Sequence, residues 1–254
     1  MKILYRTKKI GDLLIPYNTN IANAVQGFYE MGAFIDSYDY EDFEDILHYI
    51  TKDDIILDGI YQSRRVFNKF EVNAPDFDYP EEMQQFLGRK IWKDKISHIA
   101  SDQSTWGNFV KPVKDKAFTG RVINGLHDLV GCGSIHEDFE VICTEPLDIK
   151  AEYRCFIRYD NIIDIRPYGS NEERYKFPYN YNTVEEMLKA FKTWKDRPMG
   201  CSMDICVTSD NKTLLLEMND GYALGCYGLN SIDYAKLISA RWSQLLDRQD
   251  NFQF

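Results

Sequence analysis

The segment from Gly200 to Gly225, GCSMDICVTSDNKTLLLEMNDGYALG, constrains the fold more than any other part of the sequence. Two apolar runs flank the turn-forming residues 209–212, which is typical of a β-hairpin. A turn in the middle of this run places Asp204 directly opposite Glu217, with Asn219 on the same face. The sequence therefore predicts two carboxylates and an amide at one spot on the hairpin. The other face is expected to be apolar, with Met203, Ile205 and Val207 against Met218, Leu216 and Leu214.

Two carboxylates that face each other across a ladder, roughly 5 Å apart at Cβ, repel unless a cation lies between them. Asp, Glu and Asn oxygens are ligands that Mg²⁺ takes, with phosphate and water oxygens completing the shell. The alternative is an edge hairpin with a solvated polar face, on which Asp204 and Glu217 are ordinary surface charges. Cys206 and Leu215 on the same face, and the glycine-rich run after Asn219, favour the cation site.

The composition excludes several classes of protein. The chain has 254 residues, of which 44% are hydrophobic and 28% charged, as in a soluble globular protein with a sizeable core. A net charge of −10 argues against general affinity for nucleic acid. No apolar run approaches the length of a membrane span, and the apolar stretch at the start is too short for a signal peptide. We therefore expect a cytoplasmic protein with neither nucleic-acid nor membrane partners.

Cysteine and histidine spacing does not favour a zinc site. The six cysteines form no CxxC pair, and the four histidines do not cluster near them. Several cysteines lie in apolar strand patterns, which is typical of buried reduced thiols.

Strand and helix patterns alternate in the first 75 residues, which predicts a small α/β domain with a parallel sheet. Pro80, Glu81 and Glu82 then predict the start of a long helix that runs to about Ala100. A capping box at 183–186 predicts a helix that ends near Trp194. Strands dominate the rest and are expected to be antiparallel, so the fold class is α+β. Expected strands lie at 2–5, 33–35, 54–57, 109–113, 118–123, 139–143, 153–158 and 162–166, other helices at 21–31, 43–50, 64–70 and 231–246, and domains at 1–75, 76–144 and 145–254.

Three further polar features stand out. Lys111 lies on a strand and is followed by the basic, glycine-ended loop 114–120, an arrangement that suits nucleotide phosphates; the alternative is an edge-strand lysine beside an exposed turn. Glu145 ends one strand and Glu152 starts another, with a proline between them; these are either nucleotide ligands or surface charges. The strands at 153–166 carry Arg154, Arg158 and Arg166, which are suited to phosphate, to carboxylate or to salt bridges within the protein.

Taken together, these residues resemble the ATP-grasp superfamily. The resemblance lies in their order and spacing, from the strand lysine through the two glutamates to the aspartate and the pair Glu217-x-Asn219, and it spans residues 80–228. The KP…K.FTG and EYR segments look most like a short clade marked by two arginines and a lysine, assigned as amide ligases. The resemblance implies an ATP-grasp fold, in which two α+β lobes at 76–144 and 145–254 enclose ATP and are preceded by a small α/β domain at 1–75.

The resemblance also implies roles for single residues. Lys111 and Lys116 would bind phosphates under a loop that ends at Gly120, while Glu145 and the backbone near Leu147 would hold adenine and Glu152 the ribose. Asp204, Glu217 and Asn219 would hold two Mg²⁺ ions, and Arg154 would face the γ-phosphate or the substrate carboxylate. Many ATP-grasp ligases carry an arginine where this chain has Ser202, so Arg154 or Arg166 would replace it or the chemistry differs.

The activity that follows is ATP- and Mg²⁺-dependent amide formation. A substrate carboxylate would attack the γ-phosphate to give ADP and an acyl phosphate, and an amine would then displace phosphate to form an amide. Small-molecule or peptide carboxylates and amines are the expected partners, in a pocket between the N-terminal domain and the 219–228 loop, with Tyr222 and Tyr227 as lining. The alternatives are a kinase of the same fold, a nucleotide-binding protein with little catalysis, and a protein that binds no nucleotide.

Overall fold

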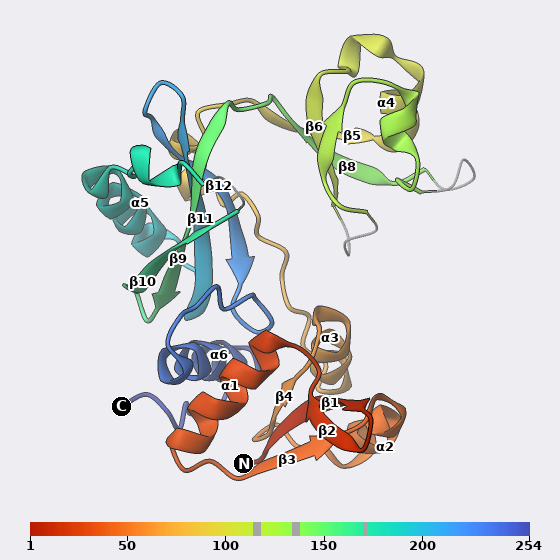
Figure 1. The fold of residues 1–254 in the computed structure, drawn as a ribbon, viewed down its shortest axis with the longest axis vertical. Helices are drawn as coiled ribbons and strands as arrows, with labels where there is room; N and C mark the ends of the chain where they lie inside the picture. Colours follow the sequence, from red (N-terminus) through yellow and green to blue (C-terminus); the bar gives the residue numbers. More distant parts are fainter. Residues whose placement is uncertain (114–117, 134–137, 170–171) are drawn as a thin grey trace. The chain divides into compact units, whose positions relative to one another are not determined.

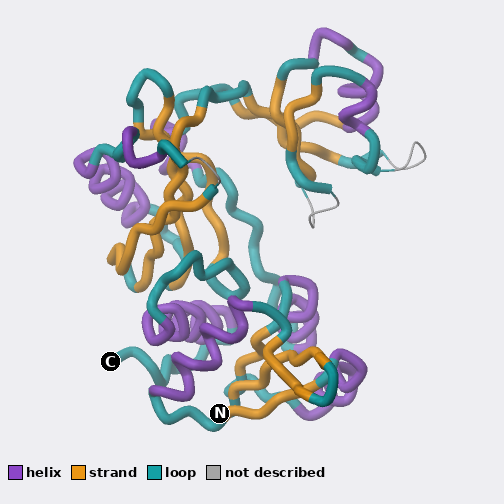
Figure 2. Tube along the Cα trace, in the orientation of Figure 1, coloured by secondary structure: helices purple, strands orange, loops and turns teal. Residues whose placement is uncertain are grey.

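The structure is a computed structural model that describes residues 1–113, 118–133, 138–169 and 172–254. It contains two compact units: Met1–Phe86 with Lys150–Phe254 form the first, and Leu87–Ile149 form the second. Both units combine helices with strands (Figure 2). The three-domain division expected from the sequence stays a prediction.

The N-terminal part of the first unit contains the expected parallel sheet. Strand β1 (Ile3–Ile10) pairs in parallel with β3 (Ile35–Tyr38) and β4 (Ile55–Leu57). The far end of β1 also forms an antiparallel hairpin with β2 (Leu13–Pro16), which sequence patterns did not predict. Helices α1 (Thr19–Glu30), α2 (Phe43–Tyr49) and α3 (Ile60–Lys69) alternate with these strands (Figure 1).

The C-terminal helix α6 (Ser231–Leu245) packs against α1 and completes the same core. Gly27 permits the close approach, because a Cβ at this position would lie 1.9 Å from the carbonyl oxygen of Ser231. The fully buried Trp242 of α6 contacts Phe67 of α3, with ring centroids 4.5 Å apart. The N-terminal segment and the end of the chain therefore share one apolar core.

The second sheet of this unit is antiparallel, as expected, with the order β10-β9-β11-β12. Pairing within the β11–β12 hairpin follows the prediction as far as Asp204 opposite Glu217. A bulge then inserts one residue, so Ile205 pairs with Leu215 and the expected pairing with Leu216 is wrong. These strands are β9 (Ile149–Arg158), β10 (Asn161–Tyr168), β11 (Gly200–Thr208) and β12 (Thr213–Asp220).

Helix α5 (Tyr181–Thr193) accompanies this sheet and corrects one predicted boundary. Its N-cap is Asn180, whose side-chain oxygen accepts a hydrogen bond from the backbone N–H of Thr183. Asparagine is among the strongest N-cap residues, so the helix begins before the capping box expected at 183–186.

The second unit holds a four-stranded sheet in the order β5-β8-β6-β7. The long helix expected from Pro80 to Ala100 is wrong. A short 3₁₀ helix (Glu81–Phe86) ends before Gly88, which adopts a positive φ of 60°, and residues Ile91–Lys95 then form β5 and pair with β8. Sheet pairing therefore overrides the helical pattern in this segment. The other elements of this unit are α4 (Ile96–Ser101), β6 (Asn108–Pro112), β7 (Arg121–Ile123), β8 (Glu140–Thr144) and 3₁₀ turns at Gln103–Thr105 and Leu126–Leu129. Two further 3₁₀ turns, at Tyr40–Asp42 and Arg174–Lys176, belong to the first unit.

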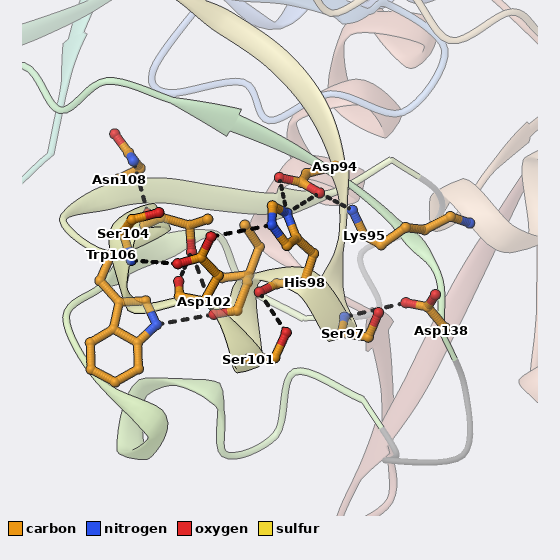
Figure 3. A network of polar contacts seen from close by, with 12 residues as sticks. Asp94, Lys95, Ser97, His98, Ser101, Asp102, Ser104, Trp106, Asn108 and Asp138 are labelled. Atoms are coloured by element: carbon orange, nitrogen blue, oxygen red, sulfur yellow. Dashed lines mark hydrogen bonds and ion pairs between the residues drawn. The ribbon is translucent and has the colours of Figure 1, made fainter.

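A polar network on α4 gives a prediction about pH. The Nδ1 atom of His98 lies 2.9 Å from Asp94, and its Nε2 atom lies 3.5 Å from Asp102 (Figure 3). The hydrogen bond and charge of Asp94 raise the pKa of His98. We expect NMR titration to give a His98 pKa above the usual value of about 6.5, and Asp94→Asn to lower it again. An unshifted His98 would contradict this network.

The sign of the effect on stability follows from the direction of the shift. Because folding raises the pKa of His98, its stabilising contribution is complete below the unfolded pKa and is lost as the pH rises through the folded pKa.

Two expectations about the whole chain can be compared with the structure. All six cysteines are buried and form no disulfide, which confirms the prediction of buried thiols. In the part of the chain that the structure describes, none of the helices has the length and apolarity needed to cross a bilayer.

Candidate functional site

Four charged residues occupy the four neighbouring strands of the β10-β9-β11-β12 sheet. Arg166 on β10 lies opposite Arg154 on β9, and Asp204 on β11 lies opposite Glu217 on β12. Strand β9 is the neighbour of β11, and the side chain of Arg154 reaches across to Asp204. The hairpin register expected for the two carboxylates is therefore confirmed, and an arginine joins them.

Asp204 is only 2% exposed, and hydrogen bonds surround its carboxylate. Arg154 donates from Nε to one oxygen at 2.8 Å and from Nη2 to the other at 2.6 Å. The hydroxyl of Ser202 donates to the first oxygen at 3.4 Å, and Nδ2 of Asn219 donates to the second at 3.0 Å. Because a carboxylate offers about four acceptor positions, these four donors use the acceptor capacity of Asp204.

Burial affects the pKa values of both Asp204 and Arg154. It raises the pKa of the Asp204 carboxyl, and the charge of Glu217 adds to the increase, while the hydrogen bonds from Arg154 oppose it. For Arg154, burial lowers the pKa, but the contacts with Asp204 outweigh that effect and raise it. A guanidinium in bidentate contact keeps a buried carboxylate ionised only while the pair is intact.

A third carboxylate, that of Glu152, lies on β9, in addition to Asp204 on β11 and Glu217 on β12. Glu152 pairs with Tyr168 of β10, whose hydroxyl hydrogen-bonds to its side chain. Burial raises the pKa of Glu152, and the charges of Asp204 and Glu217 raise it further. The charges of these three carboxylates therefore act on one another at this face of the sheet, where Arg154 supplies a positive charge.

Two aromatic rings and a loop hold the guanidinium of Arg154. Its Cζ atom lies 4.6 Å from the ring centroid of Tyr227 and 5.7 Å from that of Tyr168. Its Nη1 atom donates to the carbonyl oxygen of Gly225 at 3.4 Å. The segment after β12 is thereby connected to Asp204 through one arginine side chain.

Ser202 stands where an arginine was expected, and Arg154 and Arg166 were the two candidates to replace that arginine. Arg166 is directed to Asp164, with 2.6 Å between Nε and Oδ2, and its side chain is 42% exposed. Ser202 is fully buried beside Asp204. Of the two arginines expected to replace the missing one, Arg154 is therefore the one that contacts the aspartate.

The second unit carries the predicted phosphate-binding residues. Lys111 lies on β6 opposite Ile142 of β8 and is half-buried. A Cβ at Gly120 would lie 2.5 Å from the ring of Phe109 and 3.0 Å from Cβ of Lys111. The glycine thus brings the end of the 114–120 loop against the strand lysine, whereas Lys116 lies outside the described residues.

Glu145 and Leu147 lie just beyond β8. The exposed Glu145 side chain accepts a hydrogen bond from the backbone N–H of Lys90 at 2.9 Å, and its own N–H donates to the Lys90 carbonyl. The Leu147 carbonyl accepts from the N–H of Ile149. These contacts fix the backbone of the segment in which adenine binding was expected.

Sequence reasoning missed the part played by Tyr168. It follows Arg166 by two residues on the same strand, so strand alternation places both on one face. That alternation was the available signal.

In the part of the chain that the structure describes, no three His, Cys, Asp or Glu side chains form a metal-binding group, so a cation here would also need the oxygen of Asn219.

The chain belongs to the ATP-grasp family described as "ATP-grasp domain, R2K clade family 2", whose sequence model matches residues 86–237. The expected family and its α+β fold are thus confirmed. Among curated proteins, no sequence matches the chain.

Solved ATP-grasp structures share the fold over nearly the whole chain. A D-alanine–D-alanine ligase from Bacillus anthracis in complex with ATP is similar with a TM-score of 0.58 and 12% identity, over 97% of this chain and 99% of that one. An L-amino acid ligase from Bacillus licheniformis has a TM-score of 0.57 and 10% identity, over 100% and 76%. The ATP-grasp ligase PsnB with a minimal precursor has a TM-score of 0.53 and 12% identity, over 96% and 99%.

Proposed function

We propose that the protein is an ATP- and Mg²⁺-dependent ligase that joins a carboxylate to an amine through an acyl phosphate. The observation that carries this proposal is the sheet face on which Arg154 and the carboxylates of Glu152, Asp204 and Glu217 gather, in a member of the ATP-grasp family. The similar structures are named as ligases, which supports this choice over a kinase. We propose a cytoplasmic location, which free, buried cysteines favour.

The residues present fit Mg²⁺. Two carboxylates, Asp204 and Glu217, and the amide of Asn219 lie close together and could supply the hard oxygen ligands that Mg²⁺ takes. When bound, the ions would neutralise the charge of the ATP phosphates.

Asn219 is the residue that would have to adjust. Its Nδ2 atom donates to Asp204 at 3.0 Å and lies 3.5 Å from an oxygen of Glu217, so the amide bridges two like charges. Turning this amide would present its oxygen instead and would release one acceptor position on Asp204. Arg154 could then keep its bidentate contact while Asp204 also faces a cation.

The remaining residues supply the nucleotide site and the positioning of substrates. Lys111 and Lys116 would contact phosphates beneath a loop ending at Gly120, and Glu152 would hold the ribose hydroxyls. Glu145 and the backbone of Leu147 would hold adenine. Arg154, and Arg166 beside it, would stabilise the phosphate or carboxylate charge that develops during transfer.

An assay with pooled amino acids, short peptides and small carboxylic acids tests the reaction. With ATP and Mg²⁺, we expect ADP and free phosphate in equal amounts, together with a product formed from two substrates by loss of water. ADP without free phosphate, together with a phosphorylated substrate, would identify a kinase instead. ATP binding without any ADP would contradict the ligase assignment.

A further inference from the structure

The first unit contains a pocket of about 90 Å³ that none of the proposed nucleotide or metal ligands lines. It lies where the start of α1, the end of β4 and the segment after β12 meet, with α6 behind. One water needs a volume of roughly 15 Å³, so the pocket has room for several waters or a small organic group. A substrate pocket was expected beside the 219–228 loop with Tyr222 and Tyr227 as lining; Tyr222 lines this pocket, whereas Tyr227 does not.

Most of the apolar lining of this pocket is aliphatic, and Tyr222 and Tyr234 add two aromatic side chains. Ile21, Leu57, Leu224 and Ile238 line it, and each is at most 7% exposed. Ala24 and Ala223 contribute small side chains to this surface. Such walls stabilise a branched aliphatic group by removing it from water, and they offer no partner to a charged one.

The polar lining presents hydrogen-bond donors. The side-chain oxygen of Asn18 accepts from the N–H of Ile21, and that of Asn20 accepts from the N–H of Cys226. Within the described parts of the chain, neither amide NH₂ group has a hydrogen-bond partner. Both asparagines line the pocket and therefore have NH₂ donors to offer a ligand.

Asp58 also lines the pocket, but its carboxylate oxygens already accept hydrogen bonds within the protein. One oxygen accepts from the N–H of Gly59 and from Arg6, and the other accepts from the hydroxyl of Tyr38 at 2.7 Å. Its charge is balanced by Arg6, and its side chain is 1% exposed. Among the asparagine and aspartate side chains of the lining, the groups without a partner in the described residues are therefore the two amide donors, which suit a carboxylate or carbonyl oxygen.

We infer that this pocket binds the amine substrate of the proposed ligase, an amino acid with a small aliphatic side chain. The side chain would enter the aliphatic part, while the carboxylate would accept hydrogen bonds from Asn18 and Asn20. The amino group would then remain available for the acyl phosphate. The segment that lines the pocket with Tyr222 and Leu224 continues into Gly225, whose carbonyl contacts Arg154. This inference rests on the proposed function, but the binding step can be tested without turnover.

Saturation-transfer NMR with L-valine, L-leucine, L-phenylalanine and L-glutamate tests the pocket directly. We expect valine and leucine to bind, and phenylalanine and glutamate to bind at least about tenfold more weakly. Asn20→Asp keeps the acceptor for Cys226 but removes the NH₂ donor, and it should weaken valine binding by about tenfold or more. Ala24→Phe should abolish binding by filling the pocket.

The controls separate the pocket from the nucleotide site. Asn68→Asp makes the same change at an exposed position outside the pocket and should bind valine normally. ATP binding, measured by calorimetry, should be unchanged in Asn20→Asp. Equal binding of all four amino acids, or valine binding that survives both pocket substitutions, would overturn the inference, as would ATP binding without binding of any amino acid. Valine binding without ATP binding would support the pocket and contradict the proposed function.

Discussion

Replacing Glu217 with glutamine is expected to abolish ATP turnover. The substitution keeps the size of the side chain and its place opposite Asp204, but it removes the charge that would bridge two Mg²⁺ ions. Loss of such a ligand removes several kcal/mol of transition-state stabilisation, or on the order of 10²–10⁴ in rate. ADP formation with substrates found by the pooled assay measures the effect.

A matched control is available on α5. Glu186 is exposed and distant in sequence from the carboxylate group, so Glu186→Gln should retain full activity. Circular dichroism of Glu217→Gln should match wild type, because the side chain is only half-buried and the substitution relieves repulsion with Asp204. Turnover near the wild-type rate in the folded variant would contradict the metal assignment.

Arg154→Met is expected to destabilise the first unit by about 3–5 kcal/mol, because it leaves a buried carboxylate without its partner. Asp204 is 2% exposed and depends on Arg154 for two of its four hydrogen bonds. Urea unfolding, followed by circular dichroism and tryptophan fluorescence, measures the loss. Trp242 lies in the core of this unit and reports on it.

Two further variants separate loss of the pair from loss of a positive charge. Arg166→Met breaks a half-exposed ion pair with Asp164 and should change stability by no more than about 1 kcal/mol. Combining Arg154→Met with Asp204→Leu removes both charges and should recover much of the stability, although not the activity. Equal stability of Arg154→Met and wild type would show that Asp204 does not depend on this contact.

The alternation of residues in the hairpin was sufficient to predict the pairing of Asp204 with Glu217, because strand geometry fixes which side chains share a face. Pairing beyond this point could not be predicted, since the alternation of residues does not reveal the bulge in which Leu216 is the extra residue. The same limit explains the segment 80–100, where pairing with β8 decides the structure of Ile91–Lys95.

The bidentate contact between Arg154 and Asp204 was also beyond sequence reasoning. The two residues lie 50 positions apart, and only the order of strands in the sheet makes them neighbours. The family resemblance implied that Arg154 faces a phosphate or a substrate carboxylate, with a salt bridge inside the protein as the alternative. The carboxylate that it contacts here belongs to the protein. The role of Arg154 towards a substrate stays a prediction, as do the roles of Lys111 and Glu145 in binding the nucleotide.

Calorimetric titration of ATP into the wild-type protein, with Mg²⁺ and then with EDTA, tests the central claim most directly. We predict saturable binding that requires Mg²⁺ and that is weakened in Glu217→Gln. Absence of ATP binding to the folded wild-type protein, or binding that neither EDTA nor Glu217→Gln changes, would contradict a Mg²⁺-dependent nucleotide site at Asp204, Glu217 and Asn219.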